Sequence, residues 1–445
     1  MRHRSRHAHL VCWLGLLTAV VMVRVTTADV VATDPGPRGG SPGAGGPLPG
    51  LSQAALQLFL AGQEAIQEID SVQGTIPDTG LGLGPRFSMD SCAGCHPHPA
   101  PGGSSPPVNP QVAVATKAGA TNTVPFFISS DGPIRHAHVK RHPDGTPDGR
   151  VAPLYTITGR VDAPGCQLQQ PDFEALAAAD NLALHIPLPL FGVGLIEAID
   201  NATILANWGS QQPRKQALGI SGHPGLGRFG WKAQGPHLLS DVAGAYQTEV
   251  GVTNPLVRRE NDETAGCQFN PTPEDTVHAE ATTVIGHLPN VTKFRDFVRF
   301  LAPPTPSAET ESIATGRALF AQIGCALCHT PSLQTGASAI SALRGQTAHL
   351  YSDLILHRMG PGLADGVAKG NAGPDELRTP PLWGLGQRIF FLHDGRTTDL
   401  LEAIGAHASQ GDAHYLPSEA NAVIDAFHGL SEPQKQALLD FLRAL

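Results

Sequence analysis

The sequence is poor in charged and in aromatic residues. Only 16% of its 445 residues are Asp, Glu, Lys or Arg, and only 5% are Phe, Trp or Tyr. The low charge content excludes an acidic or basic low-complexity chain. The formal net charge is −9, so the chain lacks the basic surface that binding to nucleic acid needs. We therefore expect no nucleic acid among its partners.

Long hydrophobic runs are missing beyond the N-terminus. The most apolar later segment, residues 181–199, is interrupted by His185, Pro187, Pro189 and Glu197. A membrane-spanning helix needs about 20 predominantly apolar residues, so we expect no transmembrane segment. Gly and Pro number 50 and 39, which together is below the roughly 25–30% typical of disordered chains.

Residues 1–28 have the pattern of a secretory signal peptide. A basic start, MRHRSRHAH, precedes an apolar stretch at residues 10–23, and Thr26-Thr27-Ala28 offers a cleavage site of small residues. The apolar stretch is too short to span a membrane. We expect the mature protein in the periplasm or secreted, where disulfides are allowed.

Four of the cysteines lie in two identical C-x-x-C-H frames. Two thiols at this spacing can attach to the vinyl groups of one haem, and the following His then ligates the iron. The alternatives are a redox dithiol, which needs no such His, and a zinc site, which uses other spacings. We predict two covalently bound haem c groups. Their binding residues are Cys92, Cys95 and His96, and Cys325, Cys328 and His329.

Cys166 and Cys267 lie outside both frames. Because Cys12 leaves with the signal peptide, they are the remaining pair of cysteines in an exported chain. An even number of cysteines in an oxidising compartment favours pairing. We predict a disulfide between them.

Proline and glycine divide the rest of the chain. After the signal peptide we expect a Gly/Pro linker (29–50), an N-terminal haem c domain with an insertion (51–302), and a C-terminal cytochrome c-like domain (307–445). Hydrophobic periodicity predicts helices over 51–69, 172–181, 292–301 and 307–323. Ser431 with Gln434 predicts a capping box before a last helix. The expected fold class is mainly α, with two cytochrome c-like haem domains, the first enlarged by a long irregular insertion.

Four strings resemble the di-haem oxidoreductase family of peroxidases. They are GLGPRFSMDSCAGCHPHPAPGGSSP (82–106), RFGWKAQGPHLLSDVAGAYQTEVGVTNP (228–255), YSDLILHRMGPGLADG (351–366) and LWGLGQRIFFLHDGRTTDLLEAIGAH (382–407). The chain is more distantly similar to bacterial di-haem cytochrome c peroxidases and to the related enzyme that oxidises a tryptophan-derived quinone precursor. The resemblance extends from about residue 51 to the end.

The resemblance implies a distal ligand for the C-terminal haem, fourteen residues after a His-x-Gly turn. Here the turn begins at His393, so that position is His407, where the relatives have Met or Tyr. Asp399 predicts the start of a helix that carries His407 on its inner face. The alternatives are a core histidine at this position and Met359, in a Gly/Pro loop, as the metal ligand.

The resemblance also implies that the N-terminal haem is the reactive one. Relatives leave its sixth position open, or close it with a His about twenty residues after the frame. This chain has VAVATKAGA there, without a His. Either the site is open, or one of His136, His138 and His142 closes it. The alternative for these three histidines is a solvated basic loop.

Peroxide chemistry needs a group that moves a proton between the peroxide oxygens. In the relatives a Glu does this, some twenty residues after a Trp that lies between the haems, and the similar residues here are Glu249 and Trp231. The alternatives are a salt-bridged Glu and a core Trp, with Asp241 or His237 as the acid/base. Relatives also bind calcium where this chain has Arg388 and Phe390, so calcium is an open expectation.

Together these features predict an enzyme. We expect a periplasmic di-haem c-type oxidoreductase that reduces hydrogen peroxide or another small oxidant. A periplasmic donor would supply electrons at the C-terminal haem, and Trp231 would pass them to the N-terminal haem. The alternatives are a non-enzymatic di-haem electron carrier and a di-haem oxidase or oxygenase acting on an organic or protein substrate.

Overall fold

The computed structural model describes Met1 and residues 31–445. The expected signal peptide therefore lies, apart from Met1, outside the described residues. Within the described chain, every helix falls short of the length and apolarity that a membrane crossing needs.

Short helices joined by long irregular segments make up most of the structure. The α-helices are α1 (Gln53–Ala65), α2 (Cys92–Cys95), α3 (Gln111–Val114), α4 (Phe173–Ala178), α5 (Val193–Ala198), α6 (Asn201–Gly209), α7 (Gln212–Ala217), α8 (Leu238–Ala245), α9 (Asn290–Phe300), α10 (Glu311–Ile323), α11 (Leu400–Gly405), α12 (Asn421–His428) and α13 (Glu432–Ala444). Short 3₁₀ turns are η1 (Lys117–Gly119), η3 (Cys325–Leu327), η4 (Ser341–Leu343) and η5 (Leu385–Gln387), and η2 (Tyr246–Val250) is a π-helical turn. Each of the four helices expected from periodicity is present, with ends shifted by a few residues.

The strands form only small sheets. They are β1 (Asp70–Ser71), β2 (Gly80–Leu81), β3 (Arg86–Phe87), β4 (His136–Val139), β5 (Val151–Ala152), β6 (Tyr155–Thr156), β7 (Leu182–His185), β8 (Leu333–Gln334), β9 (Thr347–Ala348), β10 (Leu356–Arg358) and β11 (Glu376–Arg378). In the three-stranded antiparallel sheet β5-β4-β7, His136 lies directly opposite His185. Since opposite residues share a face, this register brings together two histidines that are far apart in the sequence.

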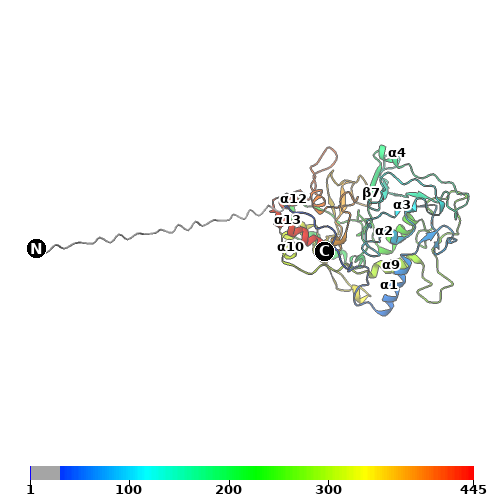
Figure 1. Cartoon of the computed structure of the whole chain (residues 1–445), viewed down its shortest axis with the longest axis horizontal. Helices are drawn as coiled ribbons and strands as arrows, with labels where there is room; N and C mark the ends of the chain where they lie inside the picture. Colours follow the sequence, from blue (N-terminus) through cyan, green and yellow to red (C-terminus); the bar gives the residue numbers. More distant parts are fainter. Residues whose placement is uncertain (2–30) are drawn as a thin grey trace.

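Two large hydrophobic cores hold the described chain together. The first contains α1 and α9, where the rings of Phe59 and Phe297 stack 5.3 Å apart. The second contains α10, α12 and α13. Figure 1 shows α1 and α9 on one side of the molecule and α10, α12 and α13 on the other. Leu343 and Leu350 belong to the first core, so the cores do not simply follow the order of the chain.

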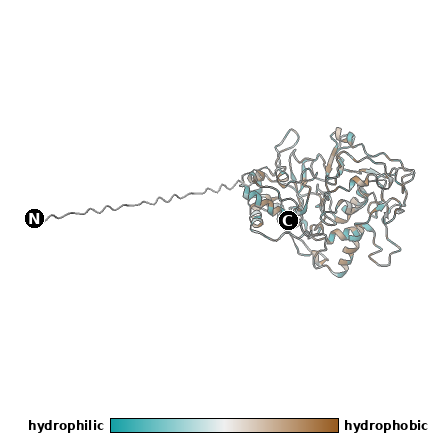
Figure 2. Ribbon diagram, viewed as in Figure 1, coloured by the Kyte–Doolittle hydropathy of each residue, from teal (hydrophilic) through white to brown (hydrophobic). Residues whose placement is uncertain are grey.

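Helices α10 and α13 pack closely against each other. A Cβ atom at Gly316 would overlap the carbonyl oxygen of Ala437, so only glycine allows this approach. Phe320 and Phe441 pack beside it, with ring centroids 5.4 Å apart. The expected capping box is present at Ser431 and Gln434. In Figure 2 these helices carry both hydrophobic and hydrophilic residues, as expected for helices that cover a core with one face.

The Gly/Pro segment is irregular, and its described part, residues 31–50, lies along the folded body. The Asp34 carboxylate pairs with Arg443 of α13 at 2.6 Å. Leu48 is buried, and its amide donates to the carbonyl of Phe300 at the end of α9. Proline and glycine therefore shape an extended segment that is held by both cores.

Cys166 and Cys267 form a disulfide, which confirms the predicted pairing. Both cysteines are buried in the first core. The bond joins positions 101 residues apart, and it fastens the irregular segment that follows η2 to the loop after β6.

Candidate functional site

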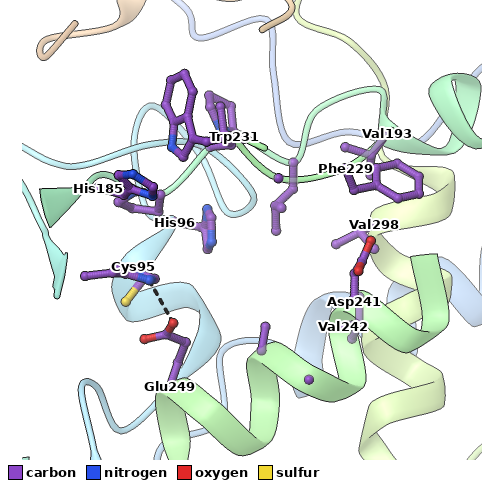
Figure 3. Close-up of a pocket in the computed structure, with 18 of the residues that line it drawn as sticks. Cys95, His96, His185, Val193, Phe229, Trp231, Asp241, Val242, Glu249 and Val298 are labelled. Atoms are coloured by element: carbon purple, nitrogen blue, oxygen red, sulfur yellow. Dashed lines mark ion pairs between the residues drawn. The ribbon is translucent and has the colours of Figure 1, made fainter. Parts of the chain in front are cut away.

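A cavity of 540 Å³ lies beside the first C-x-x-C-H frame. Cys92, Cys95 and His96 line it, and so do the two residues expected to be catalytic, Trp231 and Glu249. Figure 3 shows His96 projecting into the hollow, with Glu249 on one side and Asp241 and Val242 on the other. The fold therefore brings together residues that are up to 157 positions apart in the chain.

The short helix α2 presents His96 to this cavity. The Ser91 hydroxyl accepts a hydrogen bond from the backbone amide of Gly94 and so caps the N-terminus of the helix. The His96 Nδ1–H donates to the carbonyl oxygen of Gly103 at 3.0 Å, which leaves Nε2 without a proton. Burial lowers the pKa of His96 to about 4, so the ring is neutral at ordinary pH. A neutral imidazole oriented through Nδ1 is the form that binds a metal through Nε2.

Glu249 is paired with His136 in the same cavity. Its carboxylate lies 2.7 Å from His136 Nδ1, and both side chains are largely buried, with 15% and 16% of their area exposed. Glu249 Oε2 and His136 Nε2 have no hydrogen-bond partner among the described residues. Burial alone would lower the pKa of His136, but the Glu249 carboxylate raises it. The π-helical turn η2 carries Glu249, and such turns often occur at functional sites.

The solvated-loop interpretation of the three neighbouring histidines is wrong for His136 and His138. Both lie on β4 and line the cavity, and His138 is 8% exposed. His142 fits that interpretation, since 47% of its side chain is exposed. The alternation of His136 and His138 along a strand puts both on one face, and His185 joins them from β7.

A second cavity, of 200 Å³, lies beside the second C-x-x-C-H frame. The residues expected here all line it: Cys325, Cys328, His329, His407 and Met359. His329 repeats the arrangement of His96, because its Nδ1–H donates to the carbonyl oxygen of Tyr351 at 3.1 Å. Burial, with the nearby His407, lowers the pKa of His329 to about 4.

His407 faces His329 across this second cavity. The two ring centroids are 6.5 Å apart. Two imidazoles that bind one metal ion from opposite sides, at metal–nitrogen distances of about 2 Å, have centroids about 6 to 6.5 Å apart. The His407 Nδ1–H donates to the Ala403 carbonyl at 2.8 Å, so its Nε2 is also free. Met359 lines the same cavity and packs in a small apolar cluster around Trp231 and Leu363.

Trp231, Arg378 and Arg388 line both cavities. Trp231 is 8% exposed, and its indole N–H donates to the carbonyl of Ile186 at 2.9 Å. Both guanidinium groups are buried, and burial lowers the pKa of each to about 10. Arg388 Nε has no hydrogen-bond partner within the described chain. A buried cation of this kind needs an anion beside it.

A cluster that the sequence did not reveal lies against Cys328. His357 is held between two buried carboxylates, Asp353 at 2.9 Å and Glu419 at 2.8 Å. Glu419 also accepts hydrogen bonds from Ser221 and Gly222, so it ties the N-terminal part of the chain to α12. The hydrogen-bond partners of Glu419 are 62 to 198 positions away from it in the sequence. No local sequence pattern therefore predicts these contacts.

We expect Glu419→Gln to destabilise the protein by about 3 kcal/mol at neutral pH. Burial alone would raise the pKa of Glu419, but bonds from His357 and Ser221 lower it from 4.5 to about 2. A carboxyl with a lowered folded-state pKa stabilises the fold above its unfolded pKa, and that contribution disappears as the pH falls. Urea unfolding of both proteins should therefore give a difference that shrinks between pH 4.5 and pH 2. A difference independent of pH would contradict this account.

Comparison with known proteins gives the family. The model of the family described as "Di-haem oxidoreductase, putative peroxidase" matches residues 137–445. The match covers more than half of the chain, so the protein belongs to the di-haem oxidoreductase family, as its sequence strings suggested. No curated protein matches the chain.

Solved structures show weaker similarities. The diheme peroxidase BthA from Burkholderia thailandensis E264 is 14% identical, with a TM-score of 0.37, and the alignment covers 87% of this chain and 86% of BthA. A MauG-like protein associated with microbial copper homeostasis is 20% identical, with a TM-score of 0.25. That alignment covers 37% of this chain and 55% of the MauG-like protein. The chain thus spans about half the length of this second relative.

The residues of both cavities fit a haem. Each cavity has two cysteines and a neutral histidine with a free Nε2. The two cysteines of each frame are free thiols. The buried guanidinium groups of Arg378 and Arg388, which lie between the cavities, suit the carboxylate side chains of haem.

Proposed function

We propose that the protein is an exported di-haem c-type oxidoreductase that reduces hydrogen peroxide at its N-terminal haem. The single observation that carries the proposal is the difference between the two cavities. The C-terminal one is 200 Å³ and has two facing imidazoles, whereas the N-terminal one is 540 Å³ and has the Glu249–His136 acid–base pair beside the histidine of its frame.

In this proposal the two cysteines of each frame hold one haem by thioether bonds. His96 and His329 are the proximal ligands, and His407, rather than Met359, is the distal ligand of the C-terminal haem. A haem iron with a free coordination position supplies the binding site and the electrons for peroxide. We do not extend the proposal to calcium, because Arg388 places a buried positive charge where the resemblance expects a ligand.

Glu249 and His136 supply the protons. Reduction of peroxide follows H2O2 + 2e⁻ + 2H⁺ → 2H2O, so a proton must reach the oxygen that leaves as water. Among the described residues, Glu249 Oε2, His136 Nε2 and Asp241 Oδ2 are buried, unpartnered polar atoms of residues that line this cavity. We assign the role to the first two because they belong to one acid–base pair. The Glu249 carboxylate raises the pKa of His136 and so favours its protonated form, and the ion pair orients the carboxylate.

Trp231 is the proposed route for electrons between the two sites. It lines both cavities, and the bond from its indole N–H to Ile186 fixes the plane of the ring. A periplasmic donor would deliver electrons at the C-terminal haem. Periplasmic location is supported by the signal-like N-terminus and by the Cys166–Cys267 disulfide, since disulfides persist in oxidising compartments.

An EPR spectrum of the oxidised holoprotein, followed by stopped-flow mixing with hydrogen peroxide, tests the proposal. We expect one high-spin and one low-spin haem, and loss of the high-spin absorption band on mixing. Two low-spin haems and no reaction would favour the electron carrier. A reaction whose products show oxidation of an added organic or protein substrate, without turnover of peroxide to water, would favour the oxidase or oxygenase.

We expect His407→Gly to convert the low-spin haem to high-spin, because the C-terminal iron would lose its distal ligand. Met359→Leu is the matched control and should leave the spectrum unchanged. EPR of the two oxidised variants gives the comparison. The opposite result, with a spin change only in Met359→Leu, would assign the ligand to Met359.

A further inference from the structure

A buried charged cluster lies next to Trp231 and is not used by the proposed chemistry. The Asp365 carboxylate pairs with Lys232 Nζ at 2.7 Å and with His185 Nε2 at 2.9 Å. Lys232 is 2% exposed, and the other two are 6% exposed. Lys232 Nζ also donates to the carbonyls of Gly373 and Glu376, so its three protons all have acceptors. We call Asp365, Lys232 and His185 the Asp365 cluster.

Two members of the cluster are next in the chain to Trp231 or to the residue that accepts its hydrogen bond. Lys232 follows Trp231 directly. His185 precedes Ile186, whose carbonyl oxygen accepts a hydrogen bond from the indole N–H. The Ile186 amide donates to the backbone carbonyl oxygen of His393 at 2.7 Å. The His393 ring in turn contacts the rings of His185 and Trp231, at centroid distances of 5.6 and 6.3 Å.

The cluster joins three segments that do not share a helix or a sheet within the described chain. Asp365 comes from the loop between β10 and β11, Lys232 from the irregular segment before α8, and His185 from the end of β7. A buried charge that loses its partner is strongly unfavourable. The ion pairs therefore hold the three segments in one arrangement. Because two of these segments carry Trp231 and Ile186, this arrangement also fixes the position of the Trp231 ring between the cavities.

We propose that the Asp365 cluster is a positioning device that fixes Trp231 between the two cavities and so sets the rate of electron transfer between the haems. The proposal rests on the route through Trp231 proposed above. With a haem in each cavity, the step concerned would be the transfer of one electron from the C-terminal iron to the N-terminal iron, with no proton transferred. His185 and Lys232 line the N-terminal cavity, whereas Asp365 lines neither cavity. Asp365 therefore acts through the two cluster partners that it holds in place.

The test uses Asp365→Asn in the holoprotein, which removes the charge and keeps the shape. Photoreduction with a ruthenium complex injects one electron, and the absorption bands of the two haems follow its transfer. We expect the rate to fall severalfold, because the Trp231 ring would no longer be held in one position between the cavities. The midpoint potentials and the EPR spin states should stay unchanged. Hydrogen exchange of the peptide that contains Trp231 should become faster.

Asp162→Asn is the matched control. Asp162 is also buried and pairs with a buried cation, Arg160, at 2.9 Å, but it is not among the residues lining either cavity. We expect it to lower the unfolding midpoint without changing the electron-transfer rate. If Asp365→Asn fails to fold, the double variant Lys232→Met with Asp365→Leu removes both charges together and should show the same slow transfer.

Two results would overturn the proposal. One is a rate equal to that of the wild type in Asp365→Asn or the double variant. The other is an equal slowing in Asp162→Asn, which would mean that general destabilisation is responsible. The measurement does not involve peroxide, so a wild-type protein that fails to react with peroxide would refute the proposed function and leave this test intact.

Discussion

Replacing Glu249 by Gln is expected to slow the reaction of the holoprotein with hydrogen peroxide by about 10²–10⁴-fold. The amide cannot take up and return the proton that cleavage of the O–O bond requires. It also loses the charge that pairs with His136 at 2.7 Å. Stopped-flow measurement of the high-spin band, under excess peroxide, gives the rate constant. The EPR spectrum should keep its high-spin signal, because Glu249 is not a proposed ligand.

Asp241→Asn is the control for this substitution. Asp241 lies in α8, lines the same cavity, and has a pKa raised by burial to about 7, so it is the competing acid/base in the cavity. His237 is not among the lining residues. We expect Asp241→Asn to react within a few-fold of wild type. If it slows the reaction and Glu249→Gln does not, the proton is carried by Asp241.

Removing either cysteine pair should remove half of the covalent haem, with different effects on the spectrum and on the reaction with peroxide. Cys92→Ser with Cys95→Ser should abolish both the high-spin signal and the reaction with peroxide, because the larger cavity would lose its haem attachment. Cys325→Ser with Cys328→Ser should keep the high-spin signal and lose steady turnover, since electrons would no longer enter at the C-terminal haem. Acid-acetone extraction, with haem quantified on the protein and in the organic phase, measures attachment.

The two double variants are matched controls for each other, because the same substitution is made in the same C-x-x-C-H frame. In the wild-type protein all haem should stay on the chain after extraction. Free haem in the organic phase from wild type would contradict covalent attachment. Loss of the peroxide reaction only in Cys325→Ser with Cys328→Ser would place the reactive site at the C-terminal haem.

Much of the candidate site could be predicted because its parts are local in sequence. A C-x-x-C-H frame brings two thiols and an imidazole together within one or two helical turns, whatever the rest of the chain does. The capping box at Ser431 and the amphipathic stripe of α13 depend on spacings of three and four residues. The Cys166–Cys267 disulfide followed from counting cysteines, since only two were left. In each case the necessary contact lies within a few residues or has a single available partner.

Other parts depend on contacts that no local pattern contains. His136 and Glu249 are 113 residues apart in the chain, and each was a candidate alone, but only packing of η2 against β4 makes them a pair. The register of β4 with β7 adds His185, and the loop before β11 adds Asp365. The alternation in RHAHVKRH was the one local sign that His136 and His138 lie on a strand.

The sequence by itself determined the two C-x-x-C-H frames, the family, and the residue types near each frame. Only the tertiary structure decided that the first frame lies beside the larger cavity and that the His407 imidazole faces His329 of the second frame. It also decided that Trp231, Arg378 and Arg388 lie between the cavities. The physical reason is that covalent attachment depends on spacing along the chain, whereas cavity volume, burial and ion pairing depend on how distant segments pack together.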